Sequence, residues 1–144
     1  MLLQIAHRKR EGITILDLNG YLTFGQEDLK FRNELDRLIR ATEIRVLLNL
    51  SGLRKLDSTG MGTLLFAQAR LRDAGGHLTI SIARPSHVEL VTETHLEAVF
   101  EMFHDEQDAI NSFFPGRSIR RYDLLELVRS NVLEPANSPA NADI

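Results

Sequence analysis

The stretch that most constrains the fold is an apolar run that leads into a polar loop containing two glycines. The run spans residues 44–50 and does not alternate between apolar and polar side chains. A strand of that kind is covered on both faces, as at the centre of a sheet. Residues 51–56 are expected to connect this strand to the loop at 57–62. A helical pattern then predicts a helix from Thr59 to about Asp73.

The chain before this stretch predicts a hairpin and an amphipathic helix. Residues 3–8 and 13–18 alternate as strands do, and Glu11-Gly12 between them is typical of a turn. Asn19-Gly20 signals a further turn or a bulge. Apolar side chains at helical spacing predict a helix over residues 27–40, with acidic side chains in its first turn and basic ones in its last.

The chain after the central stretch predicts two more strands and two more helices. Glycines at 75 and 76 end the helix that starts at Thr59. Residues 77–82 alternate as a strand, and Pro85 precedes a helix expected over 86–94. Residues 99–103 are expected to form a short final strand. A closing helix begins at 104–105 and packs apolar side chains inward as far as residue 114.

The length of 144 residues favours one domain, expected over residues 2–114. Residues 115–144 form a C-terminal extension. Apolar side chains at helical spacing predict a helix at about 118–133, and the Pro, Ala, Asn and Ser content after it predicts a disordered tail. The helix of the extension is expected to pack on the domain or to cover an edge of the sheet. Dimerisation or binding of a second partner is the alternative.

Composition excludes several functional classes. Seventeen Lys and Arg against 20 Asp and Glu give a formal net charge of −3, which argues against nucleic-acid binding. The chain has no cysteine, so it forms no disulfide and offers no thiolate. No apolar run approaches the roughly 20 residues that span a bilayer, so we expect a cytoplasmic protein that does not bind membranes. The five histidines show no metal-binding spacing.

The loop at 57–62 carries the most distinctive chemistry. Asp57 or Ser58 can cap the following helix, because either side chain can accept a hydrogen bond from a free amide. Gly60 and Gly62 are poor helix residues, which suggests that another backbone or a protein surface approaches closely. A phosphate on Ser58 would lie at a helix N-terminus, where the helix dipole favours an anion. The simpler alternative is a capped helix without regulation.

Other motifs fit the loop poorly. A nucleophile elbow requires Gly-x-Ser-x-Gly, and residues 56–60 lack the first glycine. A phosphate-binding P-loop requires a Lys after its last glycine, and none follows Gly60. A phospho-aspartate receiver domain requires an acidic cluster after its first strand, and residues 18–20 provide none.

The chain resembles the STAS domain of bacterial anti-sigma factor antagonists. The likeness is carried by the run from Val46 to Leu53, by Asp57-Ser58-Thr59-Gly60-Met61-Gly62 and by Ala74-Gly75-Gly76-His77-Leu78. Residues 18–22 and 99–109 resemble the family's second strand and its closing strand and helix. The likeness covers residues 2–114. It implies an α/β domain with a mixed sheet of four to five strands and about four helices, to which the extension adds one helix.

The resemblance also implies a partner-switching role. An unphosphorylated antagonist binds an anti-sigma factor that is also a serine kinase, which releases the sigma factor. The kinase then phosphorylates the loop serine, here Ser58 with Thr59 as the alternative, and the complex weakens. A phosphatase of the metal-dependent PP2C type resets the switch.

The site expected from the resemblance is a docking surface and not an active centre. We expect no catalytic residue, no cofactor and no metal, and a monomer or weak dimer. The residues expected to contact the partner are Asp57, Ser58, Thr59, Gly60, Met61 and Gly62. The alternative function is a STAS scaffold or sensory module in a larger signalling assembly. A small hydrolase has little support, because no general base lies at a recognisable spacing from Ser58.

Overall fold

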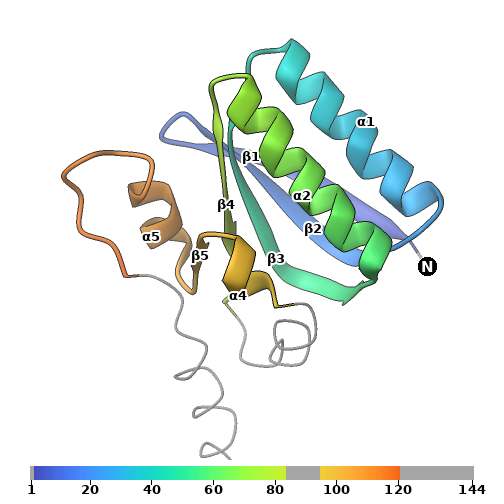
Figure 1. Cartoon of the computed structure of the whole chain (residues 1–144). Coiled ribbons are helices and arrows are strands. Elements are labelled where there is room, and N and C mark those ends of the chain that lie inside the picture. The colour runs from blue at the N-terminus through green and yellow to red at the C-terminus, as the bar shows by residue number, and fades with distance from the viewer. Residues whose placement is uncertain (1, 84–94, 121–144) are drawn as a thin grey trace, which may run out of the picture.

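The structure is a computed structural model that describes residues 2–83 and 95–120 (Figure 1). In this part of the chain it contains five strands and four helices, which confirms the expected mixed α/β fold. The elements are β1 Leu3–Arg10, β2 Ile13–Leu22, α1 Gln26–Arg40, β3 Arg45–Leu56, α2 Ser58–Asp73, β4 His77–Ser81, α4 Leu96–Val99, β5 Met102–Phe103 and α5 Glu106–Asn111.

The five strands form one sheet in the order β1-β2-β3-β4-β5. β1 is antiparallel to β2, and the remaining neighbours are parallel. β3 therefore lies at the centre, as its apolar run predicted. Val46, Leu48 and Leu50 enter the core on one face of the sheet, whereas Leu47 enters the core on the other.

The hairpin predicted for the N-terminus is confirmed. Arg10 of β1 pairs with Ile13 of β2, which leaves a two-residue turn. Both turn residues have positive φ, 53° at Glu11 and 81° at Gly12. Two consecutive positive φ angles define the turn whose twist matches that of the flanking strands.

β2 and β3 both run further than the sequence suggested. Asn19-Gly20 lies within β2, where Gly20 has φ 107°, and the β2–β3 register shifts on either side of this pair. At each shift β3 contributes one more residue than β2, so the bulges are in β3. Beyond them β2 continues and pairs Leu22 with Leu56. Residues 51–56, expected to be a connection, are therefore strand, because a continuing neighbour pairs with them and the side chains of Leu53 and Leu56 are buried.

The two faces of the sheet are covered unequally. α1 and α2 lie side by side over one face and bury the larger core (Figure 1). On the other face α5 contributes Ala109 and Ile110 to a smaller core with Ile13, Ile15 and Leu47. This arrangement leaves the outer surface of α2, and the turn before it, facing away from the sheet.

The C-terminal third differs in part from expectation. Val99 belongs to α4, so the strand expected over 99–103 contains only Met102 and Phe103. The closing helix is α5, and Ala109 and Ile110 are buried as predicted. The helix expected over 86–94 lies outside the described residues. Residues 118–120 are not helical, and the rest of the C-terminal helix and the tail also lie outside the described residues. Within the described part of the chain, no helix has the length and apolarity needed to cross a bilayer.

Candidate functional site

Asp57 is the residue that joins the central strand to α2. It has an extended backbone conformation, and its Oδ1 accepts a hydrogen bond from the Gly60 amide at 2.8 Å. A side-chain acceptor at this place is an N-cap, which satisfies an amide that has no partner within the helix. Of the two capping residues that the sequence allowed, the cap is therefore Asp57, and Ser58 is the first residue of α2.

The second carboxylate oxygen of Asp57 reaches a different loop. Oδ2 accepts a hydrogen bond at 3.0 Å from the backbone amide of Phe24, in the turn between β2 and α1. Burial alone would raise the pKa of the Asp57 carboxyl, but hydrogen bonds from the backbone amides of Gly60 and Phe24 outweigh it and lower the pKa. Asp57 is thus negatively charged at neutral pH.

Ser58 is accessible, as its predicted role requires. Its side chain is exposed in the first turn of α2, and its hydroxyl has no hydrogen-bond partner among residues 2–83 and 95–120. Thr59 is half-buried by comparison. The Ser58 hydroxyl is therefore the more accessible of the two hydroxyls in this turn.

The two glycines of the loop have different surroundings. A Cβ on Gly60 would lie 2.1 Å from the carbonyl oxygen of Leu22 and 2.7 Å from Cδ1 of Leu56, so the domain itself excludes a side chain there. A Cβ on Gly62 would meet nothing within 4 Å, and Gly62 is exposed. The close approach inferred from the pair of glycines is thus made inside the domain at Gly60, whereas no described residue approaches Gly62 in this way.

Two exposed apolar side chains, Leu65 and Phe24, and the half-buried Met61 lie on or beside the first turns of α2. Ser58, Met61, Gly62 and Leu65 fall on one stripe of this helix, at the i, i+3, i+4 and i+7 positions. We call these four residues together with Phe24 the docking surface. Leu65 is 40% exposed and Phe24 is 79% exposed. An apolar surface around an accessible hydroxyl is suited to binding another protein.

Two further apolar residues border the docking surface. Val99 of α4 is 45% exposed, and its carbonyl accepts a hydrogen bond from Gln68 of α2 at 3.4 Å. Phe66 is 39% exposed, but its ring is covered by the guanidinium groups of Arg32 and Arg70, whose Cζ atoms lie 4.6 and 5.6 Å from the ring centroid. By contrast, the Phe24 ring has no aromatic or cationic partner within the part of the chain that the structure describes.

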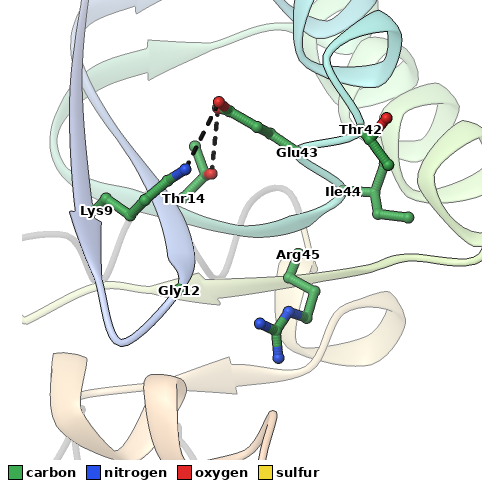
Figure 2. Close-up of a pocket in the computed structure, with 7 residues that line it drawn as sticks. All are labelled: Lys9, Gly12, Thr14, Thr42, Glu43, Ile44 and Arg45. Atoms are coloured by element: carbon green, nitrogen blue, oxygen red, sulfur yellow. Dashed lines mark hydrogen bonds and ion pairs between the residues drawn. The ribbon is translucent and has the colours of Figure 1, made fainter.

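Two cavities in the structure lie away from residues 57–62. The first, of about 140 Å³, lies between the hairpin tip and the start of β3 (Figure 2). Figure 2 shows Glu43 directed toward Lys9 and Thr14, with Lys9 Nζ 3.6 Å from its carboxylate, whereas Arg45 points away from them. The second, of about 330 Å³, is lined by Leu2, Gln4, Asn19, Gly20, Tyr21 and Arg54. Neither cavity includes the Ser58 hydroxyl.

The described residues contain no group of three or more His, Cys, Asp or Glu side chains that could hold a metal ion. Phe24 is not among the residues that the sequence assigned to the site, although its amide is bonded to Asp57. An aromatic residue directly before Gly25, in a turn that leads into a helix, was the available signal. Leu22, at the end of β2, is fully buried and belongs to the core.

Comparison with known proteins is consistent with this geometry. Residues 4–109 match the model of the STAS domain family. An anti-sigma F factor antagonist of Paenibacillus polymyxa is 25% identical over 111 residues, which cover 76% of this chain and 94% of that protein.

Solved structures share the fold. An anti-sigma factor antagonist from Mycobacterium paratuberculosis superposes with a TM-score of 0.64 at 14% identity, over 76% of this chain and 92% of that one. The anti-sigma factor antagonist SpoIIAA in its unphosphorylated form has a TM-score of 0.59 at 16% identity, over 80% of this chain and 99% of that one. Bacillus SpoIIAA in its phosphorylated form has a TM-score of 0.55 at 18% identity, over 77% of this chain and 98% of that one. With a family model that matches residues 4–109, the chain belongs to the STAS domain family.

Proposed function

We propose that this chain is an anti-sigma factor antagonist that is switched off by phosphorylation of Ser58. In its unphosphorylated form it binds an anti-sigma factor that is also a serine kinase, and so frees a sigma factor. The observation that carries the proposal is the exposed, unbonded Ser58 hydroxyl at the start of α2, within an apolar docking surface. The relative from Paenibacillus polymyxa, an anti-sigma F factor antagonist, supports the antagonist role.

The charge of a phosphate explains how such a switch would work. A phosphoserine adds about −1.5 to −2 charge at neutral pH. On Ser58 this charge would stand beside the ionised Asp57 and within a surface that the partner must desolvate. Burying an unpaired anion in an apolar interface is costly, so the complex would weaken. The free amides at the start of α2 favour an anion, so the domain itself would stay folded.

The residue assignments follow the same surface. Ser58 is the proposed acceptor, and Thr59 is the alternative. Met61 and Gly62 are proposed to contact the partner directly, whereas Asp57 and Gly60 are proposed to support the shape of the loop. The chain itself carries out no reaction in this proposal. A PP2C-type phosphatase would remove the phosphate, and the chain would act as a monomer or weak dimer in the cytoplasm.

Incubation with the cognate anti-sigma factor kinase and ATP, followed by mass spectrometry, tests the acceptor. We expect one phosphate on Ser58, and phosphate found only outside residues 58 and 59 would reject the assignment. Binding of the same kinase to Ser58→Ala and Ser58→Asp then tests the charge mechanism. We expect Ser58→Ala to bind as the wild type does and Ser58→Asp to bind more weakly. Equal binding of the two variants would contradict the mechanism.

A further inference from the structure

The turn between β2 and α1 is tied to the phosphoacceptor segment at two points. The Phe24 amide donates to Oδ2 of Asp57 at 3.0 Å, across 33 residues of sequence. The carbonyl of Leu22 lies against Gly60, where a Cβ would come within 2.1 Å of its oxygen. In Figure 1 this turn lies beside the start of α2. The residue directly before Ser58 therefore holds a second loop in place.

Phe24 is the most exposed of the large apolar side chains in the described part of the chain, at 79%. Its backbone is nevertheless fixed on both sides. Its amide is bonded to Asp57, and the next residue, Gly25, has φ 116° and accepts a hydrogen bond from the Leu29 amide at the start of α1. A large ring on a fixed backbone loses little conformational entropy when a partner covers it, and aromatic side chains are frequent binding hot spots.

We propose that Phe24 is an aromatic anchor for the kinase that phosphorylates Ser58, and that Asp57 is the positioning residue that holds it. This inference rests on the proposed function. Any protein that brings the γ-phosphate of ATP to the Ser58 hydroxyl must cover the surface around it, and Phe24 is bonded to the preceding residue. The partner therefore offers an apolar pocket next to its phosphoryl-transfer site.

The two functions of Asp57 can be separated by substitution. Asparagine is a good N-cap, so Asp57→Asn keeps a side-chain oxygen for the Gly60 amide. In that orientation its NH₂ group replaces Oδ2 and faces the Phe24 amide, which is also a donor, so this hydrogen bond is lost. Asp57→Ala removes both contacts and serves as the comparison.

Amide hydrogen exchange of the isolated chain tests the positioning step without any partner. In Asp57→Asn we expect the Phe24 amide to exchange about tenfold faster than in the wild type, because a hydrogen bond to a charged acceptor is lost. The Gly60 amide should stay protected in Asp57→Asn and lose protection in Asp57→Ala. Unchanged exchange at Phe24 in Asp57→Asn would overturn the positioning role.

Calorimetric titration tests the anchor. The probe is the purified anti-sigma factor kinase of the source organism that phosphorylates the wild-type chain. We expect Phe24→Ala to weaken binding about thirtyfold, as loss of a hot-spot aromatic side chain does. Phe24→Tyr keeps the aromatic ring and should bind with nearly wild-type affinity. Leu2→Ala is the matched control, because Leu2 is 71% exposed and lies outside the docking surface. It should bind within about twofold of the wild type.

A double-mutant cycle connects the two residues. If Asp57 acts through Phe24, Asp57→Asn weakens binding in the wild-type background and has little further effect in the Phe24→Ala background. One outcome would reject the anchor and leave the proposed function standing: Phe24→Ala binds the kinase as tightly as the wild type does, whereas Ser58→Asp binds it weakly. If no anti-sigma factor kinase phosphorylates the wild-type chain, the proposed function and the anchor both fail, and the exchange experiment still decides the Asp57 contact.

Discussion

The carbonyl oxygen of Leu22 occupies the space that a side chain on Gly60 would need, at 2.1 Å from an added Cβ. This contact brings the end of β2 against the first turn of α2. It makes Gly60 a requirement of the fold, independent of any partner. Gly62, two residues further along the same helix, has open space around it.

The first prediction uses these two glycines as a matched pair. Gly60→Ala should lower the free energy of unfolding by about 1–3 kcal/mol, because the backbone must shift to accommodate the methyl group. Gly62→Ala should raise it by up to about 1 kcal/mol, because alanine is the better helix residue and meets no obstacle. Urea unfolding of both variants measures the difference. Gly62→Ala should also weaken kinase binding if the partner approaches this position closely, and equal destabilisation by both substitutions would contradict the structure.

The second prediction concerns a buried hydroxyl. Thr79 of β4 is fully buried, and its Oγ1 has no hydrogen-bond partner within the described residues. Thr79→Val keeps the shape of the side chain and removes the unpaired hydroxyl. The free energy of unfolding should therefore rise by about 1 kcal/mol. Thr63 is the control, since it is equally buried but its Oγ1 bonds to Asp28 and Arg32. Thr63→Val should destabilise the domain by about 1–3 kcal/mol, and the opposite ranking in thermal or urea unfolding would refute the assignment.

The sequence predicted the local features of the site well. The unbroken apolar run of β3 indicates a central strand, and an acid followed by a hydroxyl indicates a helix start. Both signals depend on neighbouring residues only. The same reasoning stopped short at residues 51–56, because β3 continues there only by pairing with β2, past two shifts of the register. A strand that is held by a distant neighbour leaves little trace in its own sequence.

The contacts that give the site its shape could not be predicted for the same reason. Gly60 and Gly62 look alike in the sequence, and only the carbonyl of Leu22 distinguishes them. The bond between Asp57 and Phe24 spans 33 residues, so no local pattern indicates it. The roles of Ser58 and its neighbours in partner binding remain predictions that depend on the kinase experiments.

The third prediction is a loss of stability in acid that depends on Arg8. This residue bridges two carboxylates that join β1 to β2 and to α5: Nε lies 2.6 Å from Asp17 Oδ2, and Nη2 lies 2.7 Å from Glu106 Oε1. Hydrogen bonds from Arg8 hold the pKa of each carboxyl below its ordinary value, which is 3.8 for Asp17 and 4.5 for Glu106. A carboxyl whose pKa is lowered by folding stabilises the fold fully at a pH above its unfolded-state pKa. This contribution to the free energy of unfolding is lost as the pH falls through the folded-state pKa.

Urea unfolding at pH 7 and at several values below pH 4.5 measures this dependence. The free energy of unfolding should be level near neutral pH and fall as the solution is acidified below 4.5. Arg8→Met should lower the free energy of unfolding at neutral pH by less than about 1 kcal/mol, because the ion pairs are partly exposed. It should also make the free energy of unfolding depend less steeply on pH in acid. An unchanged slope in Arg8→Met would assign the acid sensitivity to other carboxylates.

The fourth prediction separates the docking surface from the core with two adjacent leucines of α2. Leu64 is fully buried, so Leu64→Ala should lower the free energy of unfolding by about 2–5 kcal/mol. Leu65 is 40% exposed, so Leu65→Ala should change it by less than about 0.5 kcal/mol. If the kinase covers the docking surface, Leu65→Ala should nevertheless weaken kinase binding by more than 1 kcal/mol, or about fivefold or more. Calorimetric titration together with urea unfolding of the same samples gives both quantities. Wild-type affinity in Leu65→Ala would remove this residue from the docking surface and place the partner nearer to Phe24 and Ser58.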